Sequence, residues 1–352
     1  MTKNGRPVSG PHIRRDGTDL GVVLVTGAGG AAAVTVLRSL TGRADLVAAD
    51  IDPFAAGLYL VPPQRRVLIP RGDDPAFVST LLQCAIDQGA DLVVPTVDTE
   101  LRGVSAARAE FAAHGIDLLV EEVRTLDLCL DKLRLMRHCA LTVRVPLTIE
   151  LTVESVATEL AVLGTPFIIK PRQGAGGRGF AIIHDPDELR HIPLDGSYLA
   201  QELLPGDEFS IDVLGSPDGR IVAAVPRRRD KIDSGIAVAG RTMADPALEA
   251  FGRGVAAAIG VVGVVNVQAK LDREGEPSLL EVNARFPGTM SLTQAAGIDM
   301  PLLAVQARRG RTLPDTMPFR EIGVVRHWTE VTVPIEEYAV ILPAALRDAV
   351  PG

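Results

Sequence analysis

A short apolar segment that runs directly into a glycine-rich turn is the feature that most constrains the fold of this chain. Residues 22–26 are mostly β-branched and uncharged, which predicts a buried strand. The turn at residues 27–32 has the order Gly-Ala-Gly-Gly-Ala-Ala. Val34, Leu37 and Leu40 then share one face at helical spacing, so an amphipathic helix is expected after the turn. A buried strand joined to a helix in this way is typical of α/β domains.

The same alternation of strand and helix continues to about residue 95. Apolar segments that predict strands lie at residues 45–51, 67–70 and 91–95. Residues 74–88 predict a helix, with Asp74 as its cap and Pro75 at its first position. Strands and helices at this spacing predict a doubly wound parallel sheet.

The pattern changes after about residue 120. Residues 125–139 predict a helix from the spacing of their leucines and Met136. Later strands come in pairs joined by turns that contain Gly, Pro or Asp. The pairs are residues 167–170 with 180–184, 209–214 with 220–225, and 261–271 with 278–286. Pairs of this kind indicate antiparallel α+β structure, which differs from the first part of the chain.

Length, charge and cysteine content limit the class of protein. The 352 residues suffice for about two or three domains at roughly 100–200 residues each. A net charge of −8 and an aromatic content of 4% argue against nucleic acid as a partner. The three cysteines form no C-x-x-C pair, and no segment has the pattern of a membrane helix or a secretory signal. We therefore expect a cytoplasmic protein with no membrane partner and a disordered head at residues 1–20.

The first glycine turn has a second interpretation. Residues 27–32 fit G-x-G-x-x-A, and Asp50 lies twenty-three residues beyond Gly27. This matches a dinucleotide fingerprint, in which the glycines approach a pyrophosphate and the acid binds a ribose. The first turn of any such sheet also favours these glycines. On this pattern alone, a nicotinamide-dependent oxidoreductase is an alternative function.

A second glycine-rich segment lies between two of the paired strands. Its members are Lys170, Arg178 and four glycines, Gly174, Gly176, Gly177 and Gly179. It lacks the G-K-[ST] ending of a Walker A loop, and no helix follows it. Glycine backbone amides can turn toward one anion, two cations add charge, and mobility suits a lid. The segment predicts a lid over a polyphosphate, with a flexible hairpin tip as the simpler alternative.

Polar side chains alternate along the last strand pair. One strand presents Asn266, Gln268 and Lys270 on one face, and the other presents Glu281, Asn283 and Arg285. A turn near residues 274–275 places Gln268 opposite Glu281. It also places Asn266 opposite Asn283 on the same side. Hard oxygen ligands with incomplete protein coordination suit Mg²⁺, which keeps waters and takes substrate phosphates. An ordinary half-solvated hairpin is the alternative.

A weaker signal occupies residues 201–212. The apolar pair Leu203 and Leu204 follows Glu202, and a Pro-Gly turn leads to a second acid, Glu208. Such a segment can seat a purine and bind ribose hydroxyls through a carboxylate. Surface loops carry such acids commonly, so this segment alone decides nothing.

Taken in order, these segments resemble the ATP-grasp superfamily, nearest to the branch of the carbamoyl-phosphate synthetase large subunit and biotin carboxylase. Five segments carry the resemblance: residues 23–30, 131–132, 167–180, 201–212, and 266–268 with 281–288. It implies a fold of α/β plus α+β type, in which a Rossmann-like parallel sheet, the pre-ATP-grasp domain, precedes a two-lobed ATP-grasp fold. The implied parts are a disordered head at 1–20, the pre-ATP-grasp domain at 21–122, a small lobe with the glycine lid at 123–200, a large lobe with the Mg²⁺ site at 201–334 and a tail at 335–352.

The resemblance also implies roles for single residues. Those implied to bind ATP are Lys132, Lys170, Gly174, Gly176, Gly177, Arg178, Gly179, Glu202, Leu203, Leu204, Glu208 and Gln268. Those implied to hold the metal are Glu281, Asn283 and Gln268, and those implied to act in catalysis are Arg285, Lys170 and Asn283. Residues 202–204 are the hinge that reads adenine, Glu208 binds ribose, and Arg285 faces the transferred γ-phosphoryl group. Asp212, Arg227 and Arg241 are implied as second-rank contacts.

The activity implied by the resemblance is that of an ADP-forming carboxylate–amine ligase. A carboxylate attacks the γ-phosphate of MgATP to give an acyl phosphate, and an amine then displaces phosphate. The implied cofactors are ATP and Mg²⁺, with Mn²⁺ as a substitute. The implied partners are a small-molecule carboxylate, an amine and a second copy in a homodimer. A single set of motifs favours a stand-alone ligase for a small organic acid, and an ATP-binding sensor without turnover is a further alternative.

The acceptor pocket is expected beside this nucleotide site. Asp98 and Glu100, at the end of the strand at 91–95, are candidates for its lining, as are residues 285–289. Arg326 and His327 are weaker candidates. In this interpretation the first glycine turn shapes the acceptor side and need not hold NAD.

Overall fold

The structure is a computed structural model of the chain, and it describes residues 19–174, 179–233 and 236–338. Residues 1–18 of the predicted head, residues 339–352 of the predicted tail and three predicted lid residues, Gly176, Gly177 and Arg178, lie outside the described residues. Within the described residues, no helix is long and apolar enough to cross a membrane.

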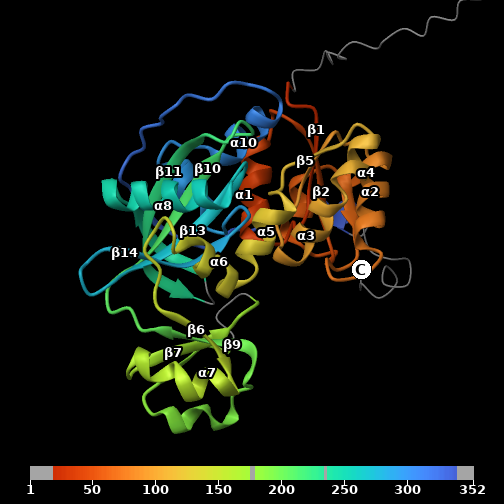
Figure 1. Cartoon of the computed structure of the whole chain (residues 1–352). Coiled ribbons are helices and arrows are strands. Elements are labelled where there is room, and N and C mark those ends of the chain that lie inside the picture. The colour runs from red at the N-terminus through yellow and green to blue at the C-terminus, as the bar shows by residue number, and fades with distance from the viewer. Residues whose placement is uncertain (1–18, 175–178, 234–235, 339–352) are drawn as a thin grey trace, which may run out of the picture.

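The N-terminal domain is a parallel sheet of five strands in the order β3-β2-β1-β4-β5 (Figure 1). Its strands are β1 Val22–Val25, β2 Asp45–Asp50, β3 Arg66–Leu68, β4 Leu92–Val94 and β5 Asp117–Leu118. Its helices are α1 Ala31–Leu40, α2 Phe77–Asp87, α3 Asp98–Ala106 and α4 Arg108–Ala113, with 3₁₀ turns at Ala56–Leu60 and Pro63–Arg65. The doubly wound parallel sheet is confirmed, and β5 is one strand more than the sequence predicted. Strand order reverses at β1, so a crevice opens at the carboxyl ends of β1 and β4.

Two of the predicted helices have different bounds in the structure. Helix α2 begins at Phe77, because the Asp74 carboxylate accepts the N–H of Ala76 at 2.8 Å and closes a turn ahead of the helix. The predicted helix at 125–139 is two helices, α5 Val123–Cys129 and α6 Lys132–Cys139. The break is at Asp131, whose Oδ1 accepts the N–H groups of the second and third residues of α6 at 3.1 Å.

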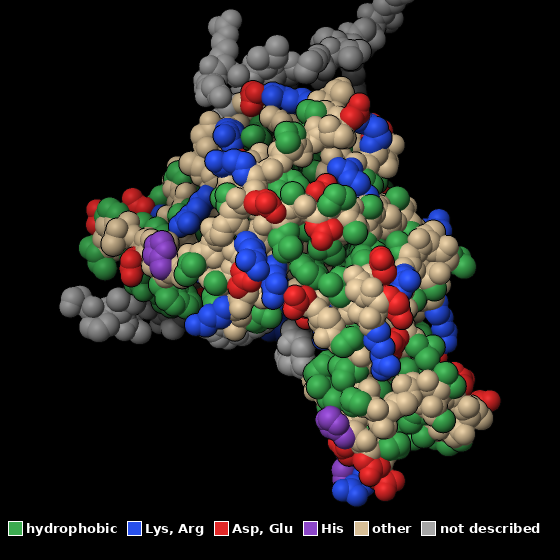
Figure 2. Space-filling model, turned by 90° about the vertical axis from the view of Figure 1, so that its left-hand side faces the viewer, with side chains coloured by type: hydrophobic (Ala, Val, Ile, Leu, Met, Phe, Trp, Pro, Cys, Tyr) green, Lys and Arg blue, Asp and Glu red, His purple; other side chains and the backbone are tan. Residues whose placement is uncertain are grey.

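The small lobe is an antiparallel sheet of four strands in the order β6-β9-β7-β8. Its elements are β6 Thr148–Thr152, α7 Val153–Thr158, β7 Phe167–Pro171, β8 Ala181–Ile183 and β9 Asp195–Glu202, with 3₁₀ turns at Leu160–Leu163 and Pro186–His191. Its apolar side chains form a separate core, which includes Leu151 and Phe167. The lobe projects from the rest of the molecule in both views (Figures 1 and 2).

The large lobe is an antiparallel sheet of six strands in the order β14-β13-β10-β11-β12-β15. Its strands are β10 Glu208–Gly215, β11 Ile221–Asp233, β12 Ile236–Thr242, β13 Val264–Leu271, β14 Pro277–Asn283 and β15 Gly323–Val325, and its helices are α8 Pro246–Ile259, α9 Met290–Ala295 and α10 Met300–Arg308. A last helix, α11 Ile335–Tyr338, returns to the N-terminal domain, where Glu337 pairs with Arg66 at 2.9 Å. One apolar core includes Leu81 and Phe111 of the N-terminal domain and Val255 and Val267 of the large lobe. These two parts are therefore packed as one body beside which the small lobe stands.

Candidate active site

A cavity of about 1240 Å³ lies where the N-terminal domain meets the two lobes. Its lining includes the first glycine turn, the loop between β4 and α3, the start of α6, the end of β7 and the facing strands β13 and β14. The parallel sheet contributes the carboxyl ends of its strands, which is where ligands bind in open α/β sheets. The first glycine turn and the polar hairpin, more than 230 residues apart in sequence, thus line the same cavity.

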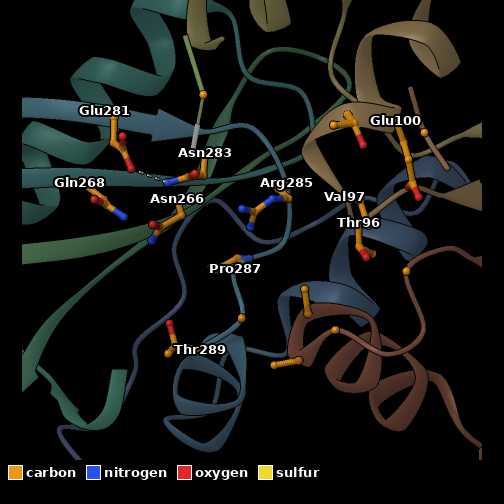
Figure 3. A pocket seen from close by; sticks show the side chains of 18 of the residues that line it. Thr96, Val97, Glu100, Asn266, Gln268, Glu281, Asn283, Arg285, Pro287 and Thr289 are labelled. Atoms are coloured by element: carbon orange, nitrogen blue, oxygen red, sulfur yellow. Dashed lines mark hydrogen bonds between the residues drawn. The ribbon is translucent and has the colours of Figure 1, made fainter. Parts of the chain in front are cut away.

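The hairpin β13–β14 has the predicted register. Gln268 is opposite Glu281, and Asn266 is opposite Asn283. All four residues line the cavity, and Figure 3 shows their side chains gathered at one end of it. Asn283 Nδ2 lies 3.4 Å from Glu281 Oε1. The alternation of two faces along each strand is what brings these oxygen atoms together.

The two predicted lysines converge on this hairpin. Lys132, the first residue of α6, donates from Nζ to the carbonyl of Gly174 at 2.7 Å and lies 3.9 Å from Glu281 Oε2. Lys170, on β7, donates from Nζ to the carbonyl of Leu280 at 3.4 Å. Burial lowers the pKa of Lys170 to about 8, against the opposing effect of the Glu281 charge. A buried ammonium beside a single carboxylate favours the arrival of further negative charge.

The glycine segment joins two antiparallel strands, as predicted. Strands β7 and β8 pair through Phe167 with Ile183 and Ile169 with Ala181. Gly174 and Gly179, the two predicted lid glycines that the structure describes, have φ of +111° and +75°. A Cβ at Gly179 would lie 2.9 Å from the Pro171 side chain and 3.0 Å from the Tyr198 hydroxyl. Backbone conformation and close packing both require glycine there.

The predicted adenine and ribose residues fall in two groups. Glu202 ends β9, Leu203 and Leu204 follow it, and none of the three contributes to the lining of the cavity. The Glu202 N–H donates to the carbonyl of Leu147 at 2.9 Å, which ties this segment to the residues before β6. Glu208 does line the cavity, and its Oε1 accepts from Arg229 Nη1 at 2.7 Å. Glu208 therefore lines the same cavity as the two lysines, whereas the three hinge residues are not part of its lining.

Arg285 is held by a residue of the other domain. Its Nε and Nη2 each donate to the Asp98 carboxylate at 2.8 Å, and its Nη1 donates to the carbonyl of Phe286 at 3.3 Å. This bidentate pair joins the segment after β14 to the first turn of α3. The sequence pointed to Asp98 and Arg285 separately and gave no sign that they pair, because 187 residues separate them.

Two of the three second-rank residues, Asp212 and Arg227, form a buried network that includes Asn266 of the cavity lining. Arg227 and Asp212, both nearly without solvent exposure, pair at 2.5 Å. The second Asp212 oxygen accepts the Thr293 hydroxyl, and Asn266 Nδ2 donates to Asp212 Oδ1 at 2.8 Å. The network therefore fixes the amide group of Asn266 through its bond to Asp212. Arg241 is different, since it lies half exposed at 3.8 Å from Asp230.

One arginine that positions Lys132 was not predicted from the sequence. Arg172 donates to both oxygens of Asp131 and, from Nη1, to Glu150 at 2.7 Å. It thereby fixes the start of α6, and with it Lys132, against the small lobe. Its position two residues after Lys170 was the available signal.

The first glycine turn is closed on itself. The N–H of Gly29 donates to Asp50 Oδ2 at 2.7 Å, and the other oxygen of Asp50 accepts the N–H of Asp52 at 2.9 Å. The N–H groups of Ala28 and Gly30 donate to backbone carbonyls. The amides and the acid that would bind a dinucleotide are thus bonded to each other, which argues against the oxidoreductase alternative.

Two family profiles match separate parts of the chain. Residues 23–119 match a profile described as the PylC-like N-terminal domain. Residues 196–331 match one described as ATP-grasp in the biosynthetic pathway with Ter operon. The chain therefore carries an ATP-grasp domain preceded by a PylC-like N-terminal domain, and the resemblance to the ATP-grasp superfamily is confirmed.

Individual proteins similar to this chain include members of the predicted branch. It is 28% identical over 177 residues to the carbamoyl phosphate synthase large chain of Halobacterium salinarum, covering 45% of this chain and 17% of that protein. It is 31% identical over 169 residues to the D-alanine–D-alanine ligase of Gloeobacter violaceus, covering 41% of this chain and 55% of that protein. The matched part of the chain thus covers about a sixth of the carbamoyl phosphate synthase large chain and about half of the D-alanine–D-alanine ligase.

A solved structure of similar fold is the biotin carboxylase of Campylobacter jejuni in complex with β,γ-ATP. The TM-score is 0.69 at 19% identity, over 83% of this chain and 72% of that one. At this identity the likeness concerns the fold alone. It agrees with the predicted fold class, a Rossmann-like sheet followed by a two-lobed ATP-grasp fold.

Proposed function

We propose that this protein is an ATP-dependent, ADP-forming ligase that converts a carboxylate into an acyl phosphate and joins it to an amine. The observation that carries the proposal is the convergence of Lys132, Lys170 and Glu281 in a cavity that continues into the N-terminal domain. Phosphoryl transfer asks a protein mainly for positioning and for neutralisation of charge. The lysines neutralise the charge of the phosphates, and the part of the cavity in the N-terminal domain can position the substrate that accepts the phosphoryl group.

In this proposal the nucleotide lies on the side of the two lobes. Lys132 and Lys170 neutralise its phosphates, the segment 174–179 covers them, and Glu208 binds the ribose. The hinge at residues 202–204 binds the adenine, an assignment that rests on the resemblance. Arg285 stabilises the transferred phosphoryl group, and its pair with Asp98 orients it for this role.

The donor atoms of the hairpin fit a magnesium ion. Glu281, Asn283 and Gln268 supply a carboxylate and two amide oxygens, the hard ligands that Mg²⁺ prefers. Within the described residues, no group of three His, Cys, Asp or Glu side chains could hold a metal by itself. A set with few protein ligands suits an ion that keeps waters and binds phosphate. When bound, Mg²⁺ neutralises developing charge on the phosphates, and Mn²⁺ is expected to substitute for it.

The test is a melting experiment followed by a turnover screen. With Mg²⁺ present, ATP is expected to raise Tm by about 3 °C or more, because it binds only the folded protein. ATP without the metal and NADH are expected to leave Tm unchanged. ADP release is then measured over pairs of carboxylates and amines, with bicarbonate and ammonia included. A shift with NADH and none with MgATP would contradict the proposal, and binding without ADP release would favour the ATP-sensor alternative.

Three further features complete the proposal. The partners are a small-molecule carboxylate and an amine. A homodimer is proposed and is tested by light scattering at several protein concentrations. A cytoplasmic location is proposed because Cys84, Cys129 and Cys139 are all free thiols, which suits a reducing compartment. Labelling of these thiols in intact cells tests that location.

A further inference from the structure

The cavity is divided by charge. Of the described residues that line it, the N-terminal domain contributes Asp50, Asp52, Glu100 and Arg71. The two lobes and α6 contribute Lys132, Lys170, Arg229, Arg285, Glu208 and Glu281. Arg71 is largely exposed and paired with Asp73 at 3.1 Å, so the N-terminal wall is anionic and the opposite wall is cationic. A polyphosphate fits the cationic wall, and a positively charged group fits the anionic one.

Glu100 is the buried carboxylate of the anionic wall. It lies in the first turn of α3 and is 4% exposed. The Thr26 hydroxyl, at the end of β1, donates to its Oε2. Gly72 packs against it so closely that a Cβ there would lie 2.8 Å from Glu100 Cγ. Three separate segments therefore fix this side chain at the surface of the cavity.

The surroundings of Glu100 are poor in positive charge. Asp50, from β2, adds a like charge nearby, while Asp98 of its own helix is occupied by Arg285. No lysine or arginine among the described residues pairs with Glu100. Burial raises the pKa of Glu100 to about 7, although the Thr26 hydroxyl acts in the opposite direction. A positively charged group of a substrate would therefore stabilise the ionised form of the Glu100 carboxylate.

Arg285 lies between Glu100 and the oxygen ligands of the hairpin. Figure 3 shows Glu281, Gln268 and Asn283 on one side of Arg285 and Thr96, Val97 and Glu100 on the other. The pair with Asp98, two residues before Glu100, fixes Arg285 to the same helix turn. An acyl phosphate formed at the hairpin would therefore have Arg285 and, beyond it, Glu100 on the side of the N-terminal domain.

We propose that Glu100 binds the ammonium group of the amine substrate and removes one of its protons. The proposal rests on the ligase function proposed above and names the residue that serves its second step. The substrate class is a primary or secondary amine that is protonated in solution. Thr26 acts as a positioning residue, because it orients the Glu100 carboxylate.

The step balances in atoms and charge. The ammonium, the acyl phosphate dianion and the Glu100 carboxylate are the reactants. The Glu100 carboxylate takes one proton, the freed lone pair of nitrogen forms the C–N bond, and the C–O bond to phosphate breaks with its electron pair. The second proton of the nitrogen leaves with the phosphate as HPO₄²⁻. The products are the amide, hydrogen phosphate and neutral Glu100.

The test separates the two half-reactions with hydroxylamine, a nucleophile that is neutral at pH 7.5. The full chain is given MgATP and a carboxylate found in the screen, and hydroxamate and amide products are measured separately. Glu100→Gln is expected to lower amide formation about 100-fold while hydroxamate formation changes less than about threefold. Glu110→Gln, an exposed glutamate of the same domain, is expected to leave both products unchanged.

A second variant keeps the carboxylate and moves it. In Gly72→Ala the added methyl group collides with Glu100 Cγ and Thr99 Oγ1, so amide formation is expected to fall by more than hydroxamate formation. The Tm shift with MgATP checks that each variant is folded. An equal loss of both products, or no loss in either variant, would overturn the assignment of Glu100. Absence of hydroxamate with the unmodified protein would instead contradict the ligase function itself.

Discussion

The two walls of the cavity differ in construction as well as in charge. The wall of the large lobe lies on a strand hairpin, in which Gln268 and Glu281 face each other across a fixed register. The N-terminal wall lies at the carboxyl ends of three parallel strands, where Thr26 follows β1, Asp50 ends β2 and Glu100 lies in the helix after β4. A paired hairpin holds groups at a constant spacing, whereas strand-end loops change without disturbing the sheet. We infer that the wall on the hairpin, the hairpin wall, determines the type of reaction and that the N-terminal wall determines which substrate is accepted.

The largest effect is expected on the hairpin wall, from Glu281→Ala. Glu281 is the only carboxylate among the three proposed metal ligands, and it also lies 3.9 Å from Lys132. Its loss is expected to lower ADP formation about 1,000-fold, which corresponds to about 4 kcal/mol of transition-state stabilisation. Steady-state ADP release at saturating MgATP measures the change.

The control for this variant is Glu276→Ala, which changes an exposed glutamate in the turn of the same hairpin. ADP release and the fold are both expected to be unchanged in the control. Far-UV circular dichroism and Tm show whether Glu281→Ala is folded. Undiminished turnover in a folded Glu281→Ala protein would mean that the metal lies elsewhere and that the hairpin wall does not determine the reaction.

The hairpin wall could be predicted from sequence because its information is local. The alternation of Asn266 and Gln268 has the period of a strand, and the position of the turn predicts their partners, Asn283 and Glu281. A bulge between Gln268 and Ala269 shifts the register of Lys270, which faces Ser278. The doubly wound sheet and the paired strands were predicted for the same reason, since each follows from a short periodic segment. The fold class and the register of the hairpin are therefore confirmed together.

The N-terminal wall could be predicted only as a list of candidates. Asp98 and Glu100 stood out at the end of a strand, but their partners, Arg285 and Thr26, lie 187 and 74 residues away. No periodicity connects such residues, because tertiary packing alone brings them together. The break between α5 and α6 was missed for a related reason, since an isolated Asp131 gives no sign that it caps a helix and binds Arg172.

The two walls are also expected to respond to pH in opposite directions. Burial raises the pKa of Glu100 from 4.5 to about 7, so its neutral form is favoured in the folded protein. The contribution of Glu100 to the free energy of unfolding is therefore largest below pH 4.5. It decreases by about 3 kcal/mol as the pH rises from 4.5 to above 7. Lys170, whose pKa is lowered to about 8, makes a contribution that rises between pH 8 and 10.5.

Denaturant unfolding of the unmodified protein and Glu100→Gln from pH 4.5 to 8.5, without nucleotide, measures the first of these changes. The variant is expected to gain stability relative to the unmodified protein as pH rises. Glu110→Gln is the control, because its exposed side chain is not expected to change the slope. A stability difference between Glu100→Gln and the unmodified protein that does not vary with pH would mean that water reaches Glu100 and that the N-terminal wall is not desolvated.

The smallest effect is expected where the two walls are joined, from Asp98→Asn. The change leaves Arg285 without the carboxylate that holds its Nε and Nη2 at 2.8 Å, so the guanidinium loses its fixed orientation. ADP formation is expected to fall about tenfold in kcat with little change in the KM for ATP, since the residue acts through another. Asp127→Asn breaks a single, more exposed ion pair with Arg102 of α3 and is expected to change kcat less than about twofold. An increase in kcat for Asp98→Asn would show that the pair restrains Arg285 instead of positioning it, and that the N-terminal wall acts on the chemistry by releasing this arginine.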